Sequence, residues 1–77
     1  MVKKIISDLP WNEKIKVLRT ARGWTQAEAA EICSTNQKMY WNWEKGKNYP
    51  RIHSQRIISR AYNVHISEIF SQRSKEL

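Results

Sequence analysis

Amides and ammonium groups are the side chains best placed to do chemistry in this sequence, and they are concentrated in a short central stretch. The residues in question are Gln37, Lys38, Asn42, Lys45 and Lys47. Such groups donate hydrogen bonds to carbonyl, ring-nitrogen and phosphate acceptors. Residues 34–51 carry four Lys and Arg against one Glu, a net charge of +3. The sequence therefore predicts an anion-binding surface in the middle of the chain.

Nucleophilic and metal-binding sets are not evident in the sequence. His53 and His65 lie twelve residues apart, and the one cysteine, Cys33, falls on a different predicted helix. A metal site usually needs three or four such ligands close together. We therefore expect no metal, no cofactor, no small-molecule ligand and no catalytic residue, and we do not expect an enzyme. Cys33 is interpreted as a small core residue.

Length and charge point to a small domain with an anionic partner. The 77 residues include 14 Lys and Arg against 7 Asp and Glu, a net charge of +7, which favours nucleic acid over a membrane surface. We expect one domain over residues 1–77, with a core at about 11–70 and flexible ends at 1–9 and 71–77. One cysteine excludes an internal disulfide, and no apolar run resembles a signal peptide or a membrane span. A cytoplasmic location is expected.

Helix-start residues and apolar spacing predict the first two helices. The first is expected to have Pro10 in its first turn, to end at Gly23 and to carry an apolar stripe formed by Trp11, Ile15 and Leu18. Thr25 and Glu28 are spaced as a capping box, in which each residue bonds the backbone of the other. The second helix therefore begins after Thr25, and it runs through Cys33.

Three further helices follow in the second half of the sequence. Asn36 is a suitable cap for the third helix, which turns Tyr40 and Trp43 inward. The fourth helix is predicted from about residue 52 to residue 62. A last short helix is predicted around Ile66–Phe70. Few Gly and Pro residues interrupt these segments, so the sequence indicates an all-α fold.

Two short helices joined by a tight turn, the second with a polar and basic outer face, are typical of a helix-turn-helix. Five segments carry this pattern in one ungapped register: Leu18–Gln26 (LRTARGWTQ), Glu28–Ala30 (EAA), Trp43–Lys47 (WEKGK), Pro50 and Tyr62–Phe70 (YNVHISEIF). Over about residues 11–70 the chain resembles the lambda-repressor and Cro-type, XRE-like, helix-turn-helix transcriptional regulators. One departure is Ser34, at a turn where the family favours Gly; a left-handed backbone there would cost about 1 kcal/mol relative to Gly.

The resemblance implies a compact five-helix domain that binds double-stranded DNA. It implies a sequence-specific transcriptional regulator, and we expect a repressor that occludes a promoter as a homodimer on a pseudo-palindromic operator. This expectation also rests on the length, which leaves no room for a sensing or polymerase-contacting domain. Two rival readings stay open. One is an antitoxin-like protein-interaction module in which DNA binding is secondary, and the other is non-specific binding of RNA or anionic membrane.

The outer face of the third helix is predicted to read bases, through Gln37, Lys38, Trp41 and Asn42. The first turn of this helix would enter the major groove, where Gln37 suits adenine and Lys38 suits guanine. Asn42 is open to either a base or a phosphate. Trp41 has two open interpretations. It contacts a thymine methyl or a sugar edge, or it packs against a neighbour such as Tyr40 or Lys45.

A second set of residues is predicted to hold the phosphates: Gln26, Asn36, Lys45, Lys47, Asn48 and Tyr49. The role of Gln26 is implied by the resemblance, and the exposed N–H groups at a helix start favour it. The alternative for Gln26 is a helix-start residue without a ligand. The alternative for the lysines is an ordinary solvated face.

The resemblance also implies a buried ion pair between Arg19 and Glu44. Arg19 follows an apolar residue on the inner side of the first helix, Glu44 follows Trp43, and a guanidinium fork suits a carboxylate. The dimer seam is predicted in the last helix and its flanks, at Val64, Ile66, Ile69 and Phe70. These side chains exceed what a small core must hide, although some of them are expected to close the core of the monomer.

Overall fold

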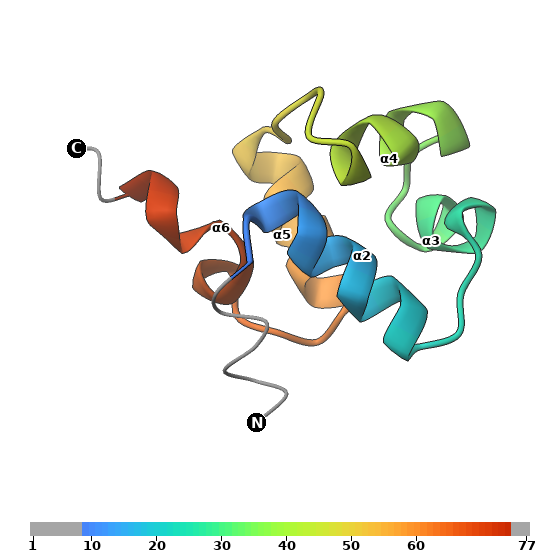
Figure 1. Cartoon of the computed structure of the whole chain (residues 1–77), viewed down its shortest axis with the longest axis horizontal. Coiled ribbons are helices and arrows are strands. Elements are labelled where there is room, and N and C mark those ends of the chain that lie inside the picture. The colour runs from blue at the N-terminus through green and yellow to red at the C-terminus, as the bar shows by residue number, and fades with distance from the viewer. Residues whose placement is uncertain (1–8, 75–77) are drawn as a thin grey trace.

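Residues 9–74 are described by a computed structural model, in which they form five α-helices and no strand (Figure 1). The helices are α2 (Trp11–Ala21), α3 (Gln26–Ile32), α4 (Gln37–Glu44), α5 (Ile52–Ala61) and α6 (Ile66–Ser74). The prediction of an all-α, five-helix domain is confirmed. Of the ends predicted to be flexible, residues 1–8 and 75–77 lie outside the described part of the chain.

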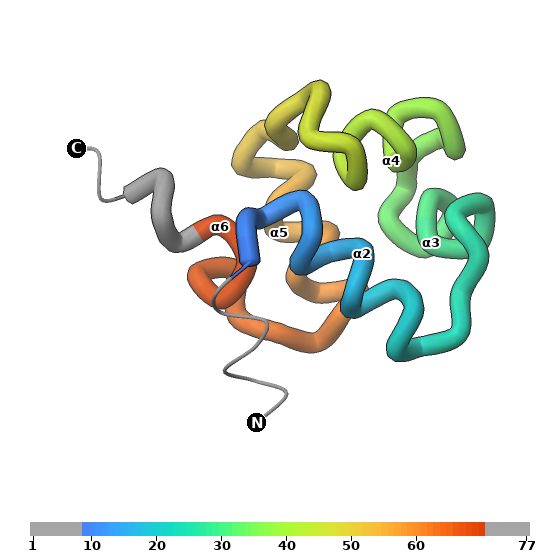
Figure 2. The backbone as a smooth tube through the Cα atoms, in the orientation of Figure 1, coloured from blue at the N-terminus to red at the C-terminus, as the bar shows by residue number. Residues whose placement is uncertain are grey.

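The five helices enclose one apolar core. α3 and α4 lie at one end of the molecule and α6 lies at the other (Figure 2). α3 packs against α4, α5 packs against α6, and α2 contacts both α4 and α6. The buried apolar side chains are Ile15, Ala29, Ala30, Cys33, Tyr40, Trp43, Ile58, Tyr62, Ile69 and Phe70. Trp11 and Leu18 pack against this cluster beside Ile15, so the predicted stripe of α2 does face the core.

The two short helices begin at the caps predicted from the sequence. Thr25 Oγ1 accepts from the Glu28 backbone N–H at 3.1 Å, and Glu28 Oε1 accepts from the Thr25 N–H at 2.9 Å. Asn36 Oδ1 accepts from the Met39 N–H at 2.7 Å. Each bond satisfies a backbone donor that the helix itself leaves unpaired. For α2 the prediction was one residue off, because Pro10 has extended backbone angles and stands at the cap position.

The turn between α3 and α4 requires a left-handed residue, and Ser34 supplies it. Its φ is 61°, in the region that glycine enters without steric cost. The departure from Gly noted in the sequence therefore falls at a position where Gly would be favoured. The turn sets how α4 leaves α3, and it thereby sets which face of α4 is turned outward.

The core contains a pair of tyrosines that join α4 to the end of α5. The hydroxyl groups of Tyr40 and Tyr62 are hydrogen-bonded at 2.5 Å, and both side chains are fully buried. The Tyr62 ring also lies against Trp24, with 5.5 Å between the ring centroids. Burial raises the pKa of both tyrosines above the ordinary value of 10.0. The two bulky residues thus fill the core and satisfy each other's polar atoms.

The last helix is longer than predicted, since α6 extends to Ser74 with non-helical backbone angles at Phe70. Lys14 of α2 is buried and donates from Nζ to the Glu68 carbonyl at 2.9 Å. This bond ties α2 to the first turn of α6. A side chain that inserts into the backbone ladder is a known cause of helix kinks, and this bond lies next to the kink.

Candidate nucleic-acid interface

α4 has an inner and an outer face, and the predicted residues divide between them as expected. Tyr40 and Trp43 are buried in the core, whereas Gln37, Lys38 and Trp41 are exposed. The fourth residue predicted to read bases, Asn42, is half-buried. This division follows from helical periodicity, because residues three and four apart share a face.

The outer face of α4 meets the first residue of α3 in a shared hollow. Gln26, Gln37, Lys38 and Trp41 line this hollow, whose volume is about 370 Å³. Gln26 is separated from Trp41 by fifteen positions in the sequence, and the turn at Ser34 brings them together. The residue predicted to bind phosphate thus lies beside three of the residues predicted to read bases. We call this four-residue surface the α3–α4 hollow.

Trp41 lies under two ammonium groups. The Nζ atom of Lys45 is 5.5 Å from the centroid of its ring, and that of Lys47 is 5.2 Å from it. At these distances a cation is attracted to the negative face of an indole. Trp41 remains 37% exposed, so contact with the lysines does not bury it. Of the two interpretations of Trp41, packing against Lys45 is therefore observed, and a surface for apolar contact is still left open.

The predicted ion pair between Arg19 and Glu44 is present. Arg19 Nε lies 2.6 Å from Glu44 Oε2, and the two side chains are 13% and 3% exposed. Arg19 Nη2 also donates to Glu44 Oε1 at 3.3 Å, so the contact uses two nitrogens of the guanidinium and both carboxylate oxygens. The hydrogen bond to Glu44 raises the pKa of Arg19 above its ordinary value. The pair fixes α4 against α2.

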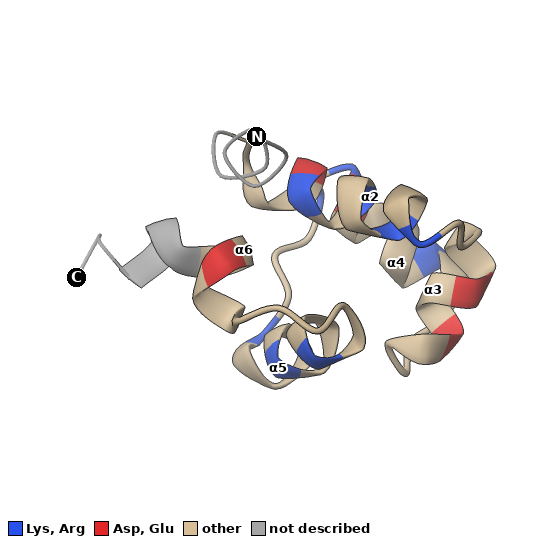
Figure 3. Cartoon of the chain, turned by 90° about the horizontal axis from the view of Figure 1, so that it is seen from below, with Lys and Arg blue, Asp and Glu red and all other residues tan. Residues whose placement is uncertain are grey.

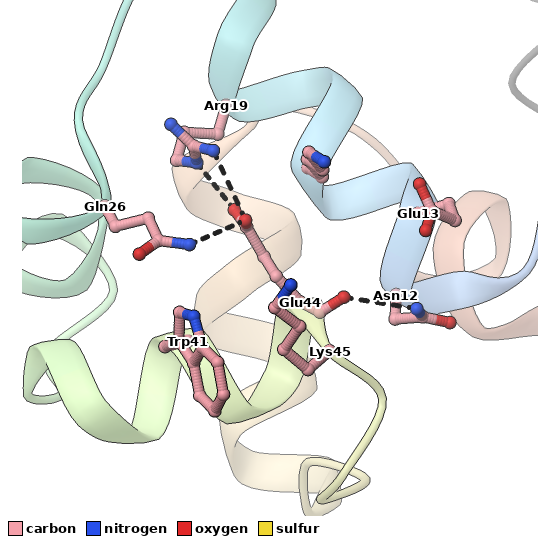
Figure 4. A pocket seen from close by; sticks show the side chains of 8 residues that line it. Asn12, Glu13, Arg19, Gln26, Trp41, Glu44 and Lys45 are labelled. Carbon is pink, nitrogen blue, oxygen red and sulfur yellow. Dashed lines mark hydrogen bonds and ion pairs between the residues drawn. The ribbon is translucent and has the colours of Figure 1, made fainter.

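A third member of this network, Gln26, was not predicted from the sequence. Its Nε2 atom donates to Glu44 Oε1 at 3.1 Å (Figure 4). In addition, Asn12 Nδ2 donates to the Glu44 backbone carbonyl at 3.2 Å, close to the end of α4. Arg19, Gln26, Trp41, Glu44 and Lys45 help to line a second hollow, of about 200 Å³, beside the α3–α4 hollow.

Like Gln26, two further residues predicted to bind phosphate are engaged within the protein. Asn36 uses Oδ1 to cap α4, which leaves its amide nitrogen as the donor for a ligand. The prediction for Tyr49 is wrong. Its ring packs edge-on against Trp11 and Phe70, at centroid distances of 5.1 and 5.8 Å, and its hydroxyl oxygen is buried. A buried hydroxyl does not reach a phosphate at the surface.

Asn48 is separated from the α3–α4 hollow. It is exposed and lines a different groove, together with Cys33, Met39, Arg51 and His53 among others. The phosphate-binding role of Asn48 stays a prediction, and the structure places this residue beside Arg51 rather than beside Trp41. In the loop after α4, Lys47 therefore lies over Trp41, whereas the next residue, Asn48, lines a different groove.

Of the four residues of the predicted dimer seam, two close the core of the monomer, as was expected of some of them, and the seam itself stays a prediction. Ile69 and Phe70 are 1% and 4% exposed and belong to the core of the monomer. Val64 and Ile66 are half-buried and pack against the same core. The physical reason is that α6 has to cover the end of the core between α2 and α5. The large apolar side chains that remain exposed in the described part of the chain are Ile32, Met39, Trp41 and Ile52.

Charge is distributed unevenly over the helices. Lys and Arg residues occur on α2, on α4 and on α5, whereas α3 carries Glu28 and Glu31 and no Lys or Arg (Figure 3). The exposed cations near the α3–α4 hollow are Lys38, Lys45 and Lys47. An anion would therefore be attracted to the outer face of α4 more strongly than to the outer face of α3.

Other kinds of site find little support in the residues that the structure describes. No group of three or more His, Cys, Asp or Glu in residues 9–74 is arranged to hold a metal ion. Cys33 is buried, and burial raises the pKa of its thiol to about 11, which keeps the thiol protonated at neutral pH. None of the described helices combines the length and the apolar character needed to cross a membrane.

Comparison with known proteins gives two matches. The model of a family described as helix-turn-helix matches residues 15–69. The chain is also 36% identical, over 63 residues, to the HTH-type transcriptional activator BcrR of Enterococcus faecalis. The matched segment covers 82% of this chain and 31% of that protein, so the chain spans about a third of the length of this curated relative. No solved structure matches the chain.

Proposed function

Since this chain belongs to the helix-turn-helix family, we propose that it is a sequence-specific, double-stranded DNA-binding regulator of transcription. The observation that carries the proposal is the α3–α4 hollow. There the exposed side chains of α4 that suit base edges lie beside Gln26, while the opposite face of the helix is buried. A net charge of +7 supports a polyanionic partner.

In this proposal α4 lies in the major groove with its N-terminus toward the bases. Gln37 would pair with the N6 and N7 edge of an adenine, and Lys38 would donate to O6 or N7 of a guanine. Trp41 would offer an apolar surface to a thymine methyl or a sugar, and Asn42 would bond a base or a phosphate. Each of these residues lies on or beside the outer face of the helix.

Phosphate contacts would hold the domain in register on the duplex. Gln26, Asn36, Lys45 and Lys47 surround the outer face of α4 and can each donate a hydrogen bond. Asn48 would act from the neighbouring groove. Contacts to phosphate carry no sequence information themselves, so they contribute to binding of every duplex alike.

The protein is further proposed to act as a homodimer on a pseudo-palindromic operator. One short helix reads few base pairs, and a two-fold dimer places a second helix about 34 Å away, one turn of DNA further on. Because Ile69 and Phe70 are used in the core, the seam has to be formed by other apolar side chains. Sedimentation at tens of micromolar tests the dimer, and one-to-one binding of a monomer to a full operator would refute it.

Two candidate functions differ in whether the protein represses or activates transcription. Occlusion of a promoter would make the protein a repressor. The similarity to a protein named as an activator favours activation instead, although the chain spans only about a third of that relative. A reporter gene with the binding site placed either over the promoter or upstream of it distinguishes the two. Lower expression from the first design indicates repression, and higher expression from the second indicates activation.

Selection of bound sites from random duplex DNA tests whether the protein binds DNA with sequence specificity. The selection uses the pH and salt concentration of the cytoplasm, where the protein is expected to act. A specific regulator enriches one motif and prefers it over bulk DNA by about 10³ or more. Failure to enrich any motif, with equal binding of RNA and anionic vesicles, would indicate a generic polycation. Co-purification with a partner protein, together with weak DNA binding, would favour an antitoxin-like module.

A further inference from the structure

We infer that Glu44 is a positioning residue that aims the amide of Gln26 toward the DNA backbone. This inference rests on the proposed function. Glu44 does not face the α3–α4 hollow itself, because its side chain is only 3% exposed and the hollow is lined by other residues. It reaches the interface through the hydrogen bond from Gln26 Nε2, at 3.1 Å.

The chemistry of the carboxylate determines how the Gln26 amide is turned. An ionised carboxylate only accepts hydrogen bonds, so the amide has to present its nitrogen, and not its oxygen, to Glu44. One N–H of Gln26 is used in this contact. The second N–H points elsewhere, and it is the donor that a phosphate oxygen needs. Without Glu44 the amide would rotate freely and present its oxygen to the phosphate in part of the population.

Arg19 makes this arrangement compatible with an anionic ligand. Its guanidinium donates to both oxygens of Glu44, at 2.6 and 3.3 Å, and so offsets the negative charge close to the proposed phosphate site. Arg19 Nη1 also donates to the Trp24 carbonyl at 2.9 Å, just before the cap of α3. The ion pair therefore fixes the start of α3 and the end of α4 together. Figure 4 shows the side chains of Arg19 and Gln26 converging on the Glu44 carboxylate.

A double-mutant cycle on the DNA dissociation constant tests the inference. Gln26→Ala removes the donor. Glu44→Gln replaces one of the two acceptor oxygens with an NH₂ donor, so the three hydrogen bonds from Arg19 and Gln26 to the carboxylate can no longer all form. Each single variant is expected to weaken binding to the selected site by about tenfold. If Glu44 acts on DNA through Gln26, the double variant is expected to bind no more weakly than the weaker single variant.

Glu31→Gln is the matched control. Glu31 is exposed on α3, and its replacement removes the same negative charge from the chain. It is expected to bind DNA as tightly as the wild type or slightly more tightly. A fall in affinity with Glu44→Gln, despite its gain in net positive charge, then cannot be a long-range charge effect. All affinities are measured at a temperature at which circular dichroism shows the variants to be folded.

A measurement on the wild-type chain covers the case in which Glu44→Gln does not fold. The side-chain amide protons of Gln26 are expected to exchange with solvent more slowly than those of Gln37, which is exposed on the neighbouring helix. Equal exchange of the two amides would overturn the inference. So would additive losses in the cycle, or an unchanged affinity of Gln26→Ala. A wild-type chain that selects no duplex sequence overturns the proposed function as well.

Discussion

The hydroxyl of Tyr40 in α4 meets the hydroxyl of Tyr62 at the end of α5, and neither side chain is accessible to solvent. Tyr62→Phe would leave the Tyr40 hydroxyl buried without its partner and is expected to cost about 1–3 kcal/mol of unfolding free energy. Replacing both tyrosines by Phe removes both polar atoms and is expected to cost less than either single change. Urea unfolding of the two single variants and of the double variant measures these free energies. A double variant less stable than both singles would contradict the argument.

Stability is expected to fall in alkaline solution, because buried groups keep protons that the unfolded chain releases. The pKa of Cys33 is raised from 9.0 to about 11, and the pKa values of Tyr40 and Tyr62 are raised above 10.0. Where the native state binds more protons, unfolding free energy decreases as pH increases. The contribution of Cys33 is complete below pH 9 and is lost as pH rises toward 11. Urea midpoints between pH 8 and 11 should fall less steeply in Cys33→Ala than in the wild type.

The ion pair between Arg19 and Glu44 is expected to matter for stability as well as for position. Arg19→Met would leave a largely buried carboxylate without its cation, at a cost of about 3–5 kcal/mol. Arg56→Met, an exposed change on α5, is expected to remain within about 0.5 kcal/mol of the wild type. Thermal unfolding compares them. A Glu44→Gln variant with unchanged melting temperature and unchanged DNA affinity would count against any role for the pair.

Substitutions of residues that read bases and of residues that hold phosphates are expected to change DNA binding in different ways. Gln37→Ala is expected to cost about 1–3 kcal/mol on the selected site and to relax the preference at one or two positions. Lys47→Ala is expected to weaken binding to all duplexes alike and to reduce the salt dependence by about one unit of slope. Arg60→Ala removes the same charge from α5 and serves as the control. If Gln37→Ala weakened specific and random duplexes equally, α4 would not be the helix that reads bases.

Ser34→Gly is expected to stabilise the protein by about 1 kcal/mol, because the backbone at this residue is left-handed. Asn63→Gly, at a φ of 55°, provides the comparison. It should have a smaller effect, since Asn tolerates this conformation better than Ser. Chemical denaturation gives both values. A destabilised Ser34→Gly variant would show that the serine side chain contributes more than its backbone strain costs.

Local signals were sufficient to predict that five helices form, and to predict the N-terminal caps of α3 and α4. The bonds made by Thr25, Glu28 and Asn36 span three residues, so the sequence around them specifies them completely. The outer face of α4 followed from periodicity together with Tyr40 and Trp43 as inner residues. The ion pair between distant helices was predicted because the family resemblance implied it.

Relations between distant segments could not be read from the sequence. Tyr49 stands in a polar loop, and its burial depends on rings at Trp11 and Phe70. The contact of Gln26 with Glu44 depends on how α3 and α4 cross, which the spacing of residues does not specify. Likewise, the sequence does not show which apolar residues of α6 belong to the monomer core and which to a dimer seam. That division depends on how much of the core surface the other helices leave uncovered.

The two lysines held over Trp41 have a consequence for the entropy of binding. A lysine side chain loses up to about 2 kcal/mol of rotational freedom when it is fixed in one conformation. Part of that freedom is already restricted in the unliganded protein, because the indole attracts both ammonium groups. When an anion arrives at the outer face of α4, Lys45 and Lys47 have less disorder left to lose, and the aromatic ring has organised them in advance.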